Sequence, residues 1–181
     1  MPVGKRIYLQ RKLPDAQLIE DFKKIPASNV GDVMGRNCAM NPRIHLVSSP
    51  KAQMMAGPAF TVKLRAGDNL ALHGALNHCN EGDVLVVSNE GDTTRALMGE
   101  IMMAYLMLVK KVSGIILDGP IRDIDEIGKW DFPVYCTGTT PGGPYKDGPG
   151  EINVPVSCGE ISVNPGDIIL GDPDGVVVIP R

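Results

Sequence analysis

Two short apolar runs in the middle of the chain flank a longer amphipathic stretch. Val84–Val87 and Gly114–Leu117 are unbroken apolar runs rich in β-branched residues, a pattern that predicts buried strands. Between them, apolar side chains recur at helical spacing over about residues 95–111, which predicts a helix. A strand, a helix and a second strand in this order indicate a βαβ unit, in which parallel strands are covered by helices.

The region before this unit predicts further elements of the same two kinds. Residues 59–64 alternate between apolar and polar side chains, as a strand with one exposed face does. Gly67-Asp68-Asn69 is expected to form a turn and the N-cap of a helix that extends to about Cys79. Nearer the N-terminus, residues 13–25 and 29–35 are predicted to be helices. Most of the chain therefore has a mixed α/β pattern.

The chain changes character near its C-terminus. Residues 137–150 form a loop rich in glycine and proline, and a loop of this length commonly serves a binding site or an interface. Asn164-Pro165-Gly166 and Asp172-Pro173-Asp174-Gly175 are strong turn signals. Short strands are expected around the loop and these turns, at residues 133–136, 153–156, 161–163, 167–170 and 175–179.

Composition and charge narrow the possible functions. Hydrophobic residues make up 43% of the chain and charged residues 22%, as in a globular protein, so residues 1–181 are expected to form one domain. The net charge of −3 and the lack of a long Lys/Arg run argue against nucleic acid as a partner. No apolar run approaches the roughly 20 residues that span a bilayer, and the first residues lack the apolar core of a signal peptide. We therefore expect a soluble cytoplasmic protein with no membrane partner.

The cysteines and the glycine motifs exclude several cofactors. Cys38, Cys79, Cys136 and Cys158 lie far apart and are expected to be free, buried thiols rather than two disulfides. The three histidines lack zinc-ligand spacing relative to these cysteines. Neither a G-x-G-x-x-G motif after a strand nor a phosphate-binding G-x-x-x-x-G-K-[ST] loop occurs, so a nucleotide cofactor has no support.

Arg122 and Asp123 follow the second buried strand of the βαβ unit. The strand leads into a turn at Asp118-Gly119-Pro120, and the two charged residues are expected in the first turn of a short helix at 122–129. Ligands of parallel sheets lie beyond the carboxyl ends of the strands. An arginine fork fits a carboxylate, and an aspartate oxygen suits Mg²⁺ or Mn²⁺, so the pair would complement a 2-oxo acid. The alternative is that both are solvated surface charges.

A second candidate site lies at the start of the predicted long helix. Backbone amides near Gly99, Ile101 and Met102 are expected to be free to bind a substrate carboxylate, and Glu100 would hold a metal-bound water. On sequence alone, the preferred interpretation is a helix with one exposed carboxylate at its favourable end. Arg95 could serve a second substrate carboxylate, although a surface ion pair is the preferred interpretation.

Several longer motifs, in order from about Ser28 to Arg181, resemble those of a known family. They are Gly57-Pro58-Ala59-Phe60-Thr61-Val62, Ala66-Gly67-Asp68-Asn69-Leu70, Gly82-Asp83-Val84-Leu85-Val86-Val87, Gly99-Glu100, Asp118-Gly119-Pro120-Ile121-Arg122-Asp123, Pro165-Gly166-Asp167 and Asp174-Gly175-Val176-Val177-Val178-Ile179-Pro180. With these motifs the chain resembles the 4-hydroxy-4-methyl-2-oxoglutarate aldolase family, whose fold family includes the regulator of ribonuclease activity A.

The resemblance implies a fold, an assembly and an activity. The fold would be an α/β protein built as a layered α/β/β/α sandwich, similar to the swivelling phosphohistidine-domain fold. The subunits would form homotrimers or homohexamers with sites between neighbours. The activity would be that of a divalent-metal-dependent, class II pyruvate aldolase, a lyase. It would cleave 4-hydroxy-4-methyl-2-oxoglutarate to two pyruvates, or 4-carboxy-4-hydroxy-2-oxoadipate to pyruvate and oxaloacetate, and would decarboxylate oxaloacetate.

The resemblance also implies roles for individual residues. Arg122 would bind the pyruvyl carboxylate and polarise the oxo group, and Asp123 would be the direct protein ligand of Mg²⁺ or Mn²⁺. Glu100 would hold the metal through water, and the amides of Gly99–Met102 would bind the substrate. The family's C-terminal helix, which can lend an acidic residue to a neighbouring subunit's metal, would follow Arg181 and is expected to be missing from the domain 1–181.

Two other functions compete with the aldolase. A non-catalytic regulator that binds a ribonuclease is the first, because the same fold family includes such regulators. Those regulators can lack the aspartate of the Arg-Asp pair, which this chain keeps as Asp123. The second is a relict scaffold without activity.

Overall fold

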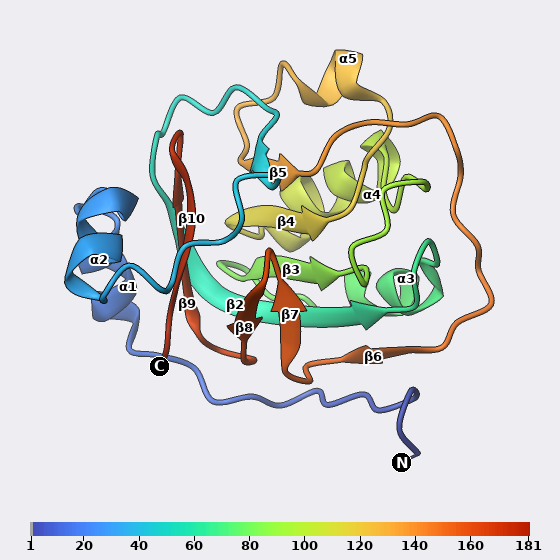
Figure 1. Ribbon diagram of the computed structural model, residues 1–181, viewed down its shortest axis with the longest axis horizontal. Coiled ribbons are helices and arrows are strands. Elements are labelled where there is room, and N and C mark those ends of the chain that lie inside the picture. The colour runs from blue at the N-terminus through green and yellow to red at the C-terminus, as the bar shows by residue number, and fades with distance from the viewer. Residues whose placement is uncertain (1) are drawn as a thin grey trace.

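A curved eight-stranded sheet forms the centre of the computed structural model, which describes residues 2–181 (Figure 1). The strand order is β1-β5-β4-β3-β2-β9-β10, and β6 also pairs with β2. β2, β3, β4 and β5 run parallel to one another, as the predicted βαβ unit requires. The strands of this sheet are β1 (His45–Leu46), β2 (Met55–Leu64), β3 (Val84–Ser88), β4 (Gly114–Asp118), β5 (Val134–Cys136), β6 (Gly150–Ile152), β9 (Ile168–Asp172) and β10 (Gly175–Ile179).

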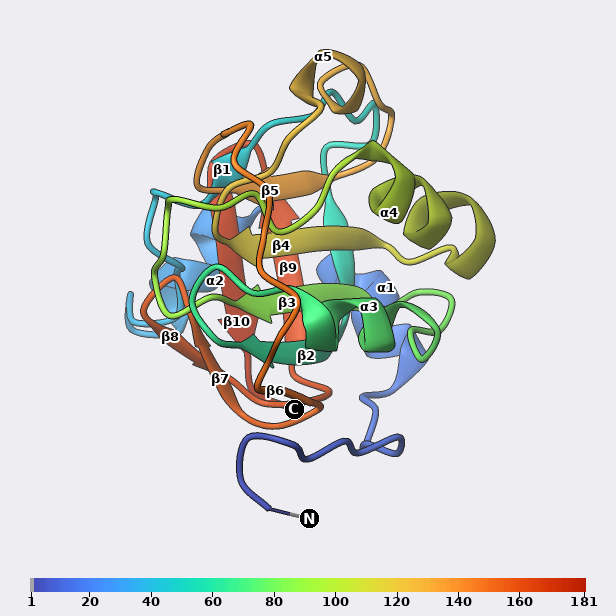
Figure 2. The same cartoon turned by 90° about the vertical axis from the view of Figure 1, so that its right-hand side faces the viewer.

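Helices cover two opposite sides of the molecule, and a small second sheet lies beside the main one. Figure 2 shows α3 and α4 together on one side of β3 and β4, with β7 and β8 on the other side. The remaining elements are α1 (Ala16–Phe22), α2 (Ala27–Val33), α3 (Leu70–Leu76), α4 (Glu100–Ala104), the π-helix η1 (Tyr105–Lys110), α5 (Ile124–Ile127), β7 (Val156–Cys158) and β8 (Ile161–Val163).

The buried apolar residues of the described chain gather in clusters between successive layers. One cluster lies between the parallel strands and α3, α4 and η1, and includes Leu85 and Leu106. A second joins the opposite face of these strands to β7–β10, through residues such as Ile116 and Val163. A third packs α1 and α2 against β9 and β10, with Val30 at its centre. The order helix, sheet, sheet, helix confirms the predicted α/β/β/α sandwich.

The predicted helix over 95–111 starts five residues late. Residues 96–99 are extended instead: Ala96 N–H donates to Gly142 O at 2.8 Å, Leu97 N–H donates to Pro120 O at 3.0 Å, and Met98 forms a β-bridge with Ile121. These hydrogen bonds to two distant segments replace the helical ones. Leu97 and Met98 are nevertheless buried and apolar, so they continue the apolar pattern of the helix in the sequence. The pattern therefore does not indicate that the helix begins only at Glu100.

Smaller differences from the predicted elements have local causes. The second helix begins at Ala27, directly after Pro26, rather than at residue 29. The strand predicted at 153–156 does not form as such, because β6 ends at Ile152 and Asn153 has a positive φ of 53°. The long loop predicted over 137–150 ends one residue early, since β6 begins at Gly150.

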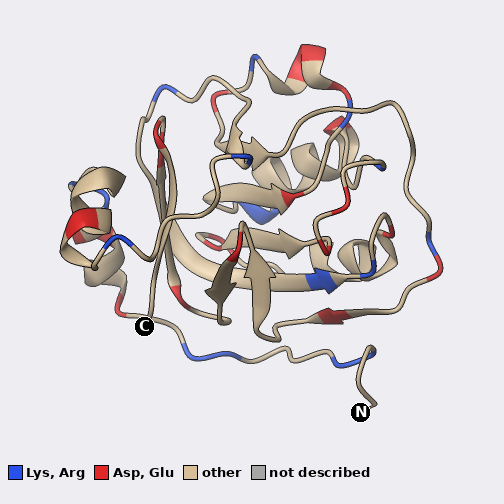
Figure 3. Ribbon diagram, in the orientation of Figure 1, with Lys and Arg blue, Asp and Glu red and all other residues tan. Residues whose placement is uncertain are grey.

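Charged residues are sparse on the strands, and most lie on the loops and helices (Figure 3). All four cysteines are buried and free, as predicted. Among residues 2–181, no helix has the length and apolar character needed to cross a membrane.

The N-terminal segment, residues 2–12, runs along the outer edge of β6. Ile152 N–H donates to Arg6 O at 2.9 Å, and Tyr8 N–H donates to Ile152 O at 3.1 Å. The Arg6 guanidinium also forms two hydrogen bonds with the Glu151 carboxylate, at 2.5 and 2.9 Å. Glu151 is almost fully buried, and these bonds lower its pKa to about 2. The segment is therefore held to the sheet by a buried, charge-assisted contact.

Glu151→Gln is expected to lower the free energy of unfolding at neutral pH by roughly 2 kcal/mol. A carboxylate with a depressed pKa stabilises the fold above its ordinary value of 4.5, and that stabilisation is lost as the pH falls toward 2. The difference between wild type and variant should therefore shrink across this range in urea unfolding experiments. Glu126→Gln, which removes an exposed pair with Lys129, should change stability by less than about 1 kcal/mol. A Glu151→Gln difference that stays constant down to about pH 2 would contradict this assignment.

Candidate active site

Arg122 and Asp123 are fixed by the segment that follows β4. Ile121 is fully buried and forms β-bridges with both Met98 and Thr139, so the chain is held from two sides just before the charged pair. Arg122 N–H donates to Met98 O at 3.0 Å. The side chains of Arg122 and Asp123 remain 54% and 44% exposed. The backbone is thus rigidly placed while both functional groups face solvent.

Asp123 adopts a left-handed backbone conformation, with φ 64° and ψ 37°. Aspartate tolerates this region better than most residues. The prediction that Arg122 and Asp123 belong to the first turn of a helix is therefore wrong: α5 begins at Ile124, and Asp123 is its N-cap residue. The left-handed turn directs the Asp123 carboxylate to the start of α4 instead, where Oδ2 accepts the Glu100 N–H at 3.0 Å.

Gly99 is where the two predicted segments meet. A Cβ atom at this position would lie 2.3 Å from Asp123 Oδ2 and 3.0 Å from Arg122 Nε. Both distances are shorter than a van der Waals contact, so only glycine at position 99 leaves room for the side chains of Arg122 and Asp123. Arg122 Nε and Asp123 Oδ2 lie 3.7 Å apart. The structure therefore brings together Gly99, Glu100, Arg122 and Asp123, which are distant in sequence.

The three residues that begin α4 have different environments. The Glu100 amide is occupied by Asp123, so it is not a free donor in this arrangement. The first turn of a helix leaves its N–H groups without intrahelical acceptors, so the amides of Ile101 and Met102 keep the predicted donor character. The Ile101 side chain is 86% exposed. Met102 lines a cavity beside Arg122.

Two cavities lie next to Arg122 and share it as a wall. The first, of about 460 Å³, is also lined by Asp123. The second, of about 260 Å³, is also lined by Gly99. The loop 137–150 lines both, in agreement with its predicted role at a site. The first also includes Ile124, Thr139, Thr140 and Pro141, and the second Asn69, Ala96, Leu97, Met98, Met102, Gly143, Pro144 and Lys146.

Asn69 and Lys146 were not predicted as site residues. The predicted cap is Asp68, and its Oδ1 accepts the Leu70 N–H at 2.9 Å. The Asn69 side chain, at the N-cap position of α3, makes no capping bond, and its Nδ2 donates to Leu97 O at 2.9 Å. Asn69 Oδ1 is buried without a hydrogen-bond partner in the described chain. A polar cap residue that does not cap is visible only once the tertiary structure is known, and a lone lysine in a Gly/Pro loop carries no signal of its own.

Arg95 contacts the loop 137–150 rather than an acidic side chain of the described residues. Nη2 donates to the Tyr145 hydroxyl at 3.0 Å, and the guanidinium carbon lies 4.7 Å from the centre of the Tyr145 ring. Nη1 donates to Gly143 O at 3.2 Å. The preferred interpretation, a surface ion pair, is therefore wrong: Arg95 attaches the loop 137–150 to the segment before α4.

The acidic groups at this site suit a hydrated cation rather than a closed metal cage. Among residues 2–181, no three His, Cys, Asp or Glu side chains are close enough to hold a metal ion together. The Asp123 carboxylate is fixed here by the Glu100 N–H, and Glu100, the first residue of α4, is the acidic residue adjacent to it. Mg²⁺ keeps several of its waters and commonly uses one or two carboxylates, so this donor set fits Mg²⁺ or Mn²⁺. Glu126, a further carboxylate nearby, is paired with Lys129 at 2.8 Å.

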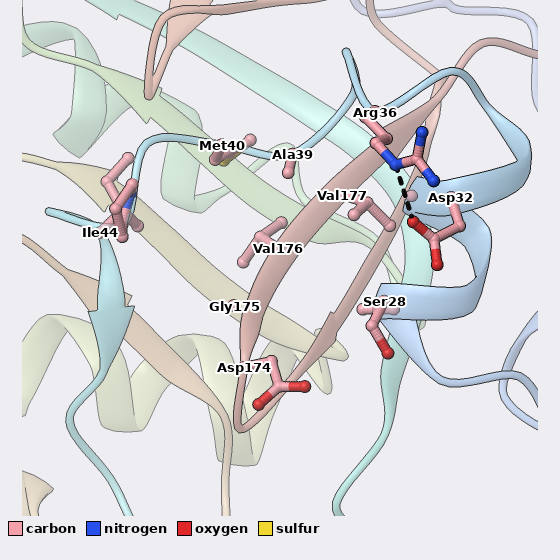
Figure 4. Close-up of a pocket in the computed structure, with 13 residues that line it drawn as sticks. Ser28, Asp32, Arg36, Ala39, Met40, Ile44, Asp174, Gly175, Val176 and Val177 are labelled. Carbon is pink, nitrogen blue, oxygen red and sulfur yellow. Dashed lines mark hydrogen bonds and ion pairs between the residues drawn. The ribbon is translucent and has the colours of Figure 1, made fainter.

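Another cavity, of about 310 Å³, lies between α2, the segment 36–44 and β10 (Figure 4). Apolar side chains such as Met40, Ile44 and Val176 line its interior. Asp32 and Arg36 form an exposed ion pair at 3.2 Å within its lining. It shares no lining residue with the cavities around Arg122, so it is not part of the candidate active site.

Several known proteins are similar to this chain in sequence or in structure. A protein from Halalkalibacterium halodurans with the provisional name 4-hydroxy-4-methyl-2-oxoglutarate aldolase is 38% identical over 92% of this chain and 78% of its own. A Bacillus anthracis protein with the same name is 32% identical over 71% of this chain and 79% of its own. RraAS2 from Streptomyces coelicolor, described as an unusual member of the RNase ES inhibitor RraA protein family, is 27% identical. Its crystal structure superposes with a TM-score of 0.84, covering 94% of this chain and 88% of its own.

The family model described as RraA-like, Aldolase/RraA, matches residues 16–178. This span runs from the first residue of α1 to the last but one of β10 and includes both segments of the candidate site. The chain therefore belongs to the RraA-like family.

Proposed function

We propose that this protein is a divalent-metal-dependent lyase that releases pyruvate from 2-oxo acids. Its substrates would be 4-hydroxy-4-methyl-2-oxoglutarate or 4-carboxy-4-hydroxy-2-oxoadipate, and it would also decarboxylate oxaloacetate. The observation that carries the proposal is the convergence of the Arg122 guanidinium and the Asp123 carboxylate above Gly99. The names of the two relatives with 38% and 32% identity support the same chemistry.

Arg122 would bind the pyruvyl end of the substrate. Its guanidinium is half exposed, and no carboxylate neutralises it at hydrogen-bond distance, since Asp123 Oδ2 lies 3.7 Å away. A planar fork of donors can bind a substrate carboxylate and direct a further N–H at the adjacent 2-oxo oxygen. The amides of Ile101 and Met102 would supply further donors to the substrate. In this role Arg122 lowers the energy of negative charge that develops on the oxo oxygen.

Asp123 would hold the metal directly, and Glu100 would hold it through water. One oxygen of Asp123 is engaged by the Glu100 N–H, which orients the carboxylate and leaves the other oxygen for the cation. When bound, Mg²⁺ or Mn²⁺ supplies Lewis-acid stabilisation of charge on the 2-oxo oxygen. Cleavage breaks the C3–C4 bond after the 4-hydroxyl loses its proton, and C3 is then protonated to give pyruvate. A water molecule, rather than a side chain, is proposed to carry the proton.

The exposure of the site favours an assembly in which a second copy covers it. Arg122 and Asp123 are both about half exposed, whereas enzymes that stabilise developing charge usually exclude water from it. A homotrimer or homohexamer, with the site near a subunit boundary, would provide that cover. Ile101, beside Glu100, and Leu108 and Val109, farther along on η1, are exposed apolar side chains that such a contact could cover.

Arg122→Lys is expected to lower kcat/KM for pyruvate release by about 10- to 30-fold, because a lysine cannot form the bidentate contact with the carboxylate. The assay couples released pyruvate to NADH oxidation by added lactate dehydrogenase, in the presence of Mg²⁺ or Mn²⁺. Arg36→Lys, just beyond α2 in an exposed ion pair with Asp32, is the matched control and should leave kcat/KM unchanged. Equal kcat/KM values for Arg122→Lys and the wild type would remove Arg122 from the mechanism.

A non-catalytic regulator of a ribonuclease is the second candidate. It is supported by the TM-score of 0.84 with RraAS2, which is described as belonging to an RNase ES inhibitor family. In that case the purified protein would form a stable complex with a ribonuclease and show no pyruvate release with either metal. Retention of Asp123 beside Arg122 favours the lyase.

A further inference from the structure

A separate polar cavity, of about 380 Å³, lies at the carboxyl ends of β2, β3 and β4. Lys63, Ser88 and Asp118 are register partners on these three neighbouring strands, so their side chains lie side by side on one face. This is the face whose residues pack toward β7 and β8, opposite α3 and α4. Cavities of this size at strand carboxyl ends commonly bind small molecules.

Part of the charge in this cavity is already neutralised. Asp118 is buried and accepts two hydrogen bonds from the Arg43 guanidinium, both at 3.0 Å, and a third from Gly159 N–H at 2.9 Å. Arg43 also contacts Glu160 at 2.5 Å. These three side chains form a fixed wall, and the charge of Asp118 is already paired with that of Arg43.

The other polar groups that line the cavity remain available. Lys63 and Glu90 are exposed and take part in none of the ion pairs that residues 2–181 form. Ser88 is the register partner of Lys63 on the neighbouring strand and presents a hydroxyl donor to the cavity. Pro155 and Val156 add an apolar wall. One free cation, one free carboxylate and the hydroxyls of Ser88 and Ser157 thus share a cavity with an apolar side.

We infer that this cavity binds a free α-amino acid with a small apolar side chain. Lys63 and Ser88 would hold its carboxylate. Glu90 and Oε2 of Glu160, the oxygen that Arg43 and Asn41 leave unoccupied, would hold its ammonium group, and its side chain would lie against Val156. The formal charges decide against a simple anion: two cations, Lys63 and Arg43, face three carboxylates, so a dianion would meet net repulsion whereas a zwitterion is matched at both ends. This site is independent of the proposed lyase reaction.

The test is isothermal titration calorimetry of the full chain with alanine, valine and leucine, each compared with its amide and its N-acetyl derivative. At least one amino acid should bind saturably at one site per chain, with a Kd of about 1 mM or lower. The amide lacks the carboxylate and the N-acetyl form lacks the ammonium group, so both should bind at least tenfold more weakly.

Variants connect the binding to the cavity. Lys63→Met and Glu90→Gln should each weaken binding at least tenfold at an unchanged melting temperature, whereas Lys51→Met, at an exposed lysine elsewhere, should not. A Kd above about 1 mM for all three amino acids, or equal binding of the N-acetyl derivative, would overturn the inference. So would unchanged affinity in both cavity variants.

Discussion

Asp123→Asn is expected to lower metal-dependent pyruvate release by about 10³-fold, because it removes the negative oxygen proposed to hold the cation. Asparagine is the informative replacement at this position. It tolerates the left-handed conformation that Asp123 adopts, with φ 64°, and its carbonyl can still accept the Glu100 N–H. The backbone of the site is therefore kept while the charge is lost. The measurement is kcat with saturating Mg²⁺ or Mn²⁺, together with the melting temperature.

The control for this variant is Asp21→Asn, which removes an exposed carboxylate on α1. Its kcat should equal that of the wild type, and both variants should unfold within a few degrees of it. Asp123→Ala provides a second comparison, since alanine adds backbone strain of about 1 kcal/mol at a positive φ and should also reduce stability. Retention of wild-type turnover by Asp123→Asn would exclude Asp123 as a metal ligand.

Gly99→Ala is expected to reduce kcat by about 10²-fold without a change in overall fold. The added Cβ would lie 2.3 Å from Asp123 Oδ2, so the carboxylate and the Arg122 side chain must both move away from their present positions. A displacement of about 1 Å in a catalytic group is enough for an effect of this size. The variant separates positioning from chemistry, because all charged groups of the site are still present.

Gly31→Ala is the matched control for Gly99→Ala. Gly31 lies within α2, and a Cβ there would meet no atom within 4 Å. Alanine also favours a helix over glycine by nearly 1 kcal/mol, so this control should be as active as the wild type and slightly more stable. Wild-type kcat in Gly99→Ala would show that the contact between Gly99 and the Arg122-Asp123 pair has no functional role.

The strands of the sheet were predictable because their signals are local. Runs such as Val84–Val87 and Gly114–Leu117 are buried on both faces, and their composition alone indicates this. The position of Arg122 and Asp123 after β4 follows from the same pattern, since the chain must leave the sheet there. For these segments, burial and local propensity agree.

The details of the site depend on contacts between distant segments. Residues 96–99 are extended because they bond to Pro120 and Gly142, and nothing in their own sequence indicates those partners. Contacts between distant segments also set the left-handed conformation of Asp123. They also bring Gly99 so close to the Asp123 carboxylate that no Cβ would fit at position 99. Asn69, Lys146 and the loop contact of Arg95 likewise become visible only once the loop 137–150 is placed.

The most direct test of the proposed activity is the amount of pyruvate that the purified wild-type chain releases from 4-hydroxy-4-methyl-2-oxoglutarate, with Mg²⁺ or Mn²⁺ and again after removal of metal with EDTA. The proposal predicts two pyruvates per substrate consumed with metal, no release above the uncatalysed rate after chelation, and recovery when metal is restored. Pyruvate release at the uncatalysed rate with both metals present, from a folded protein, would contradict it.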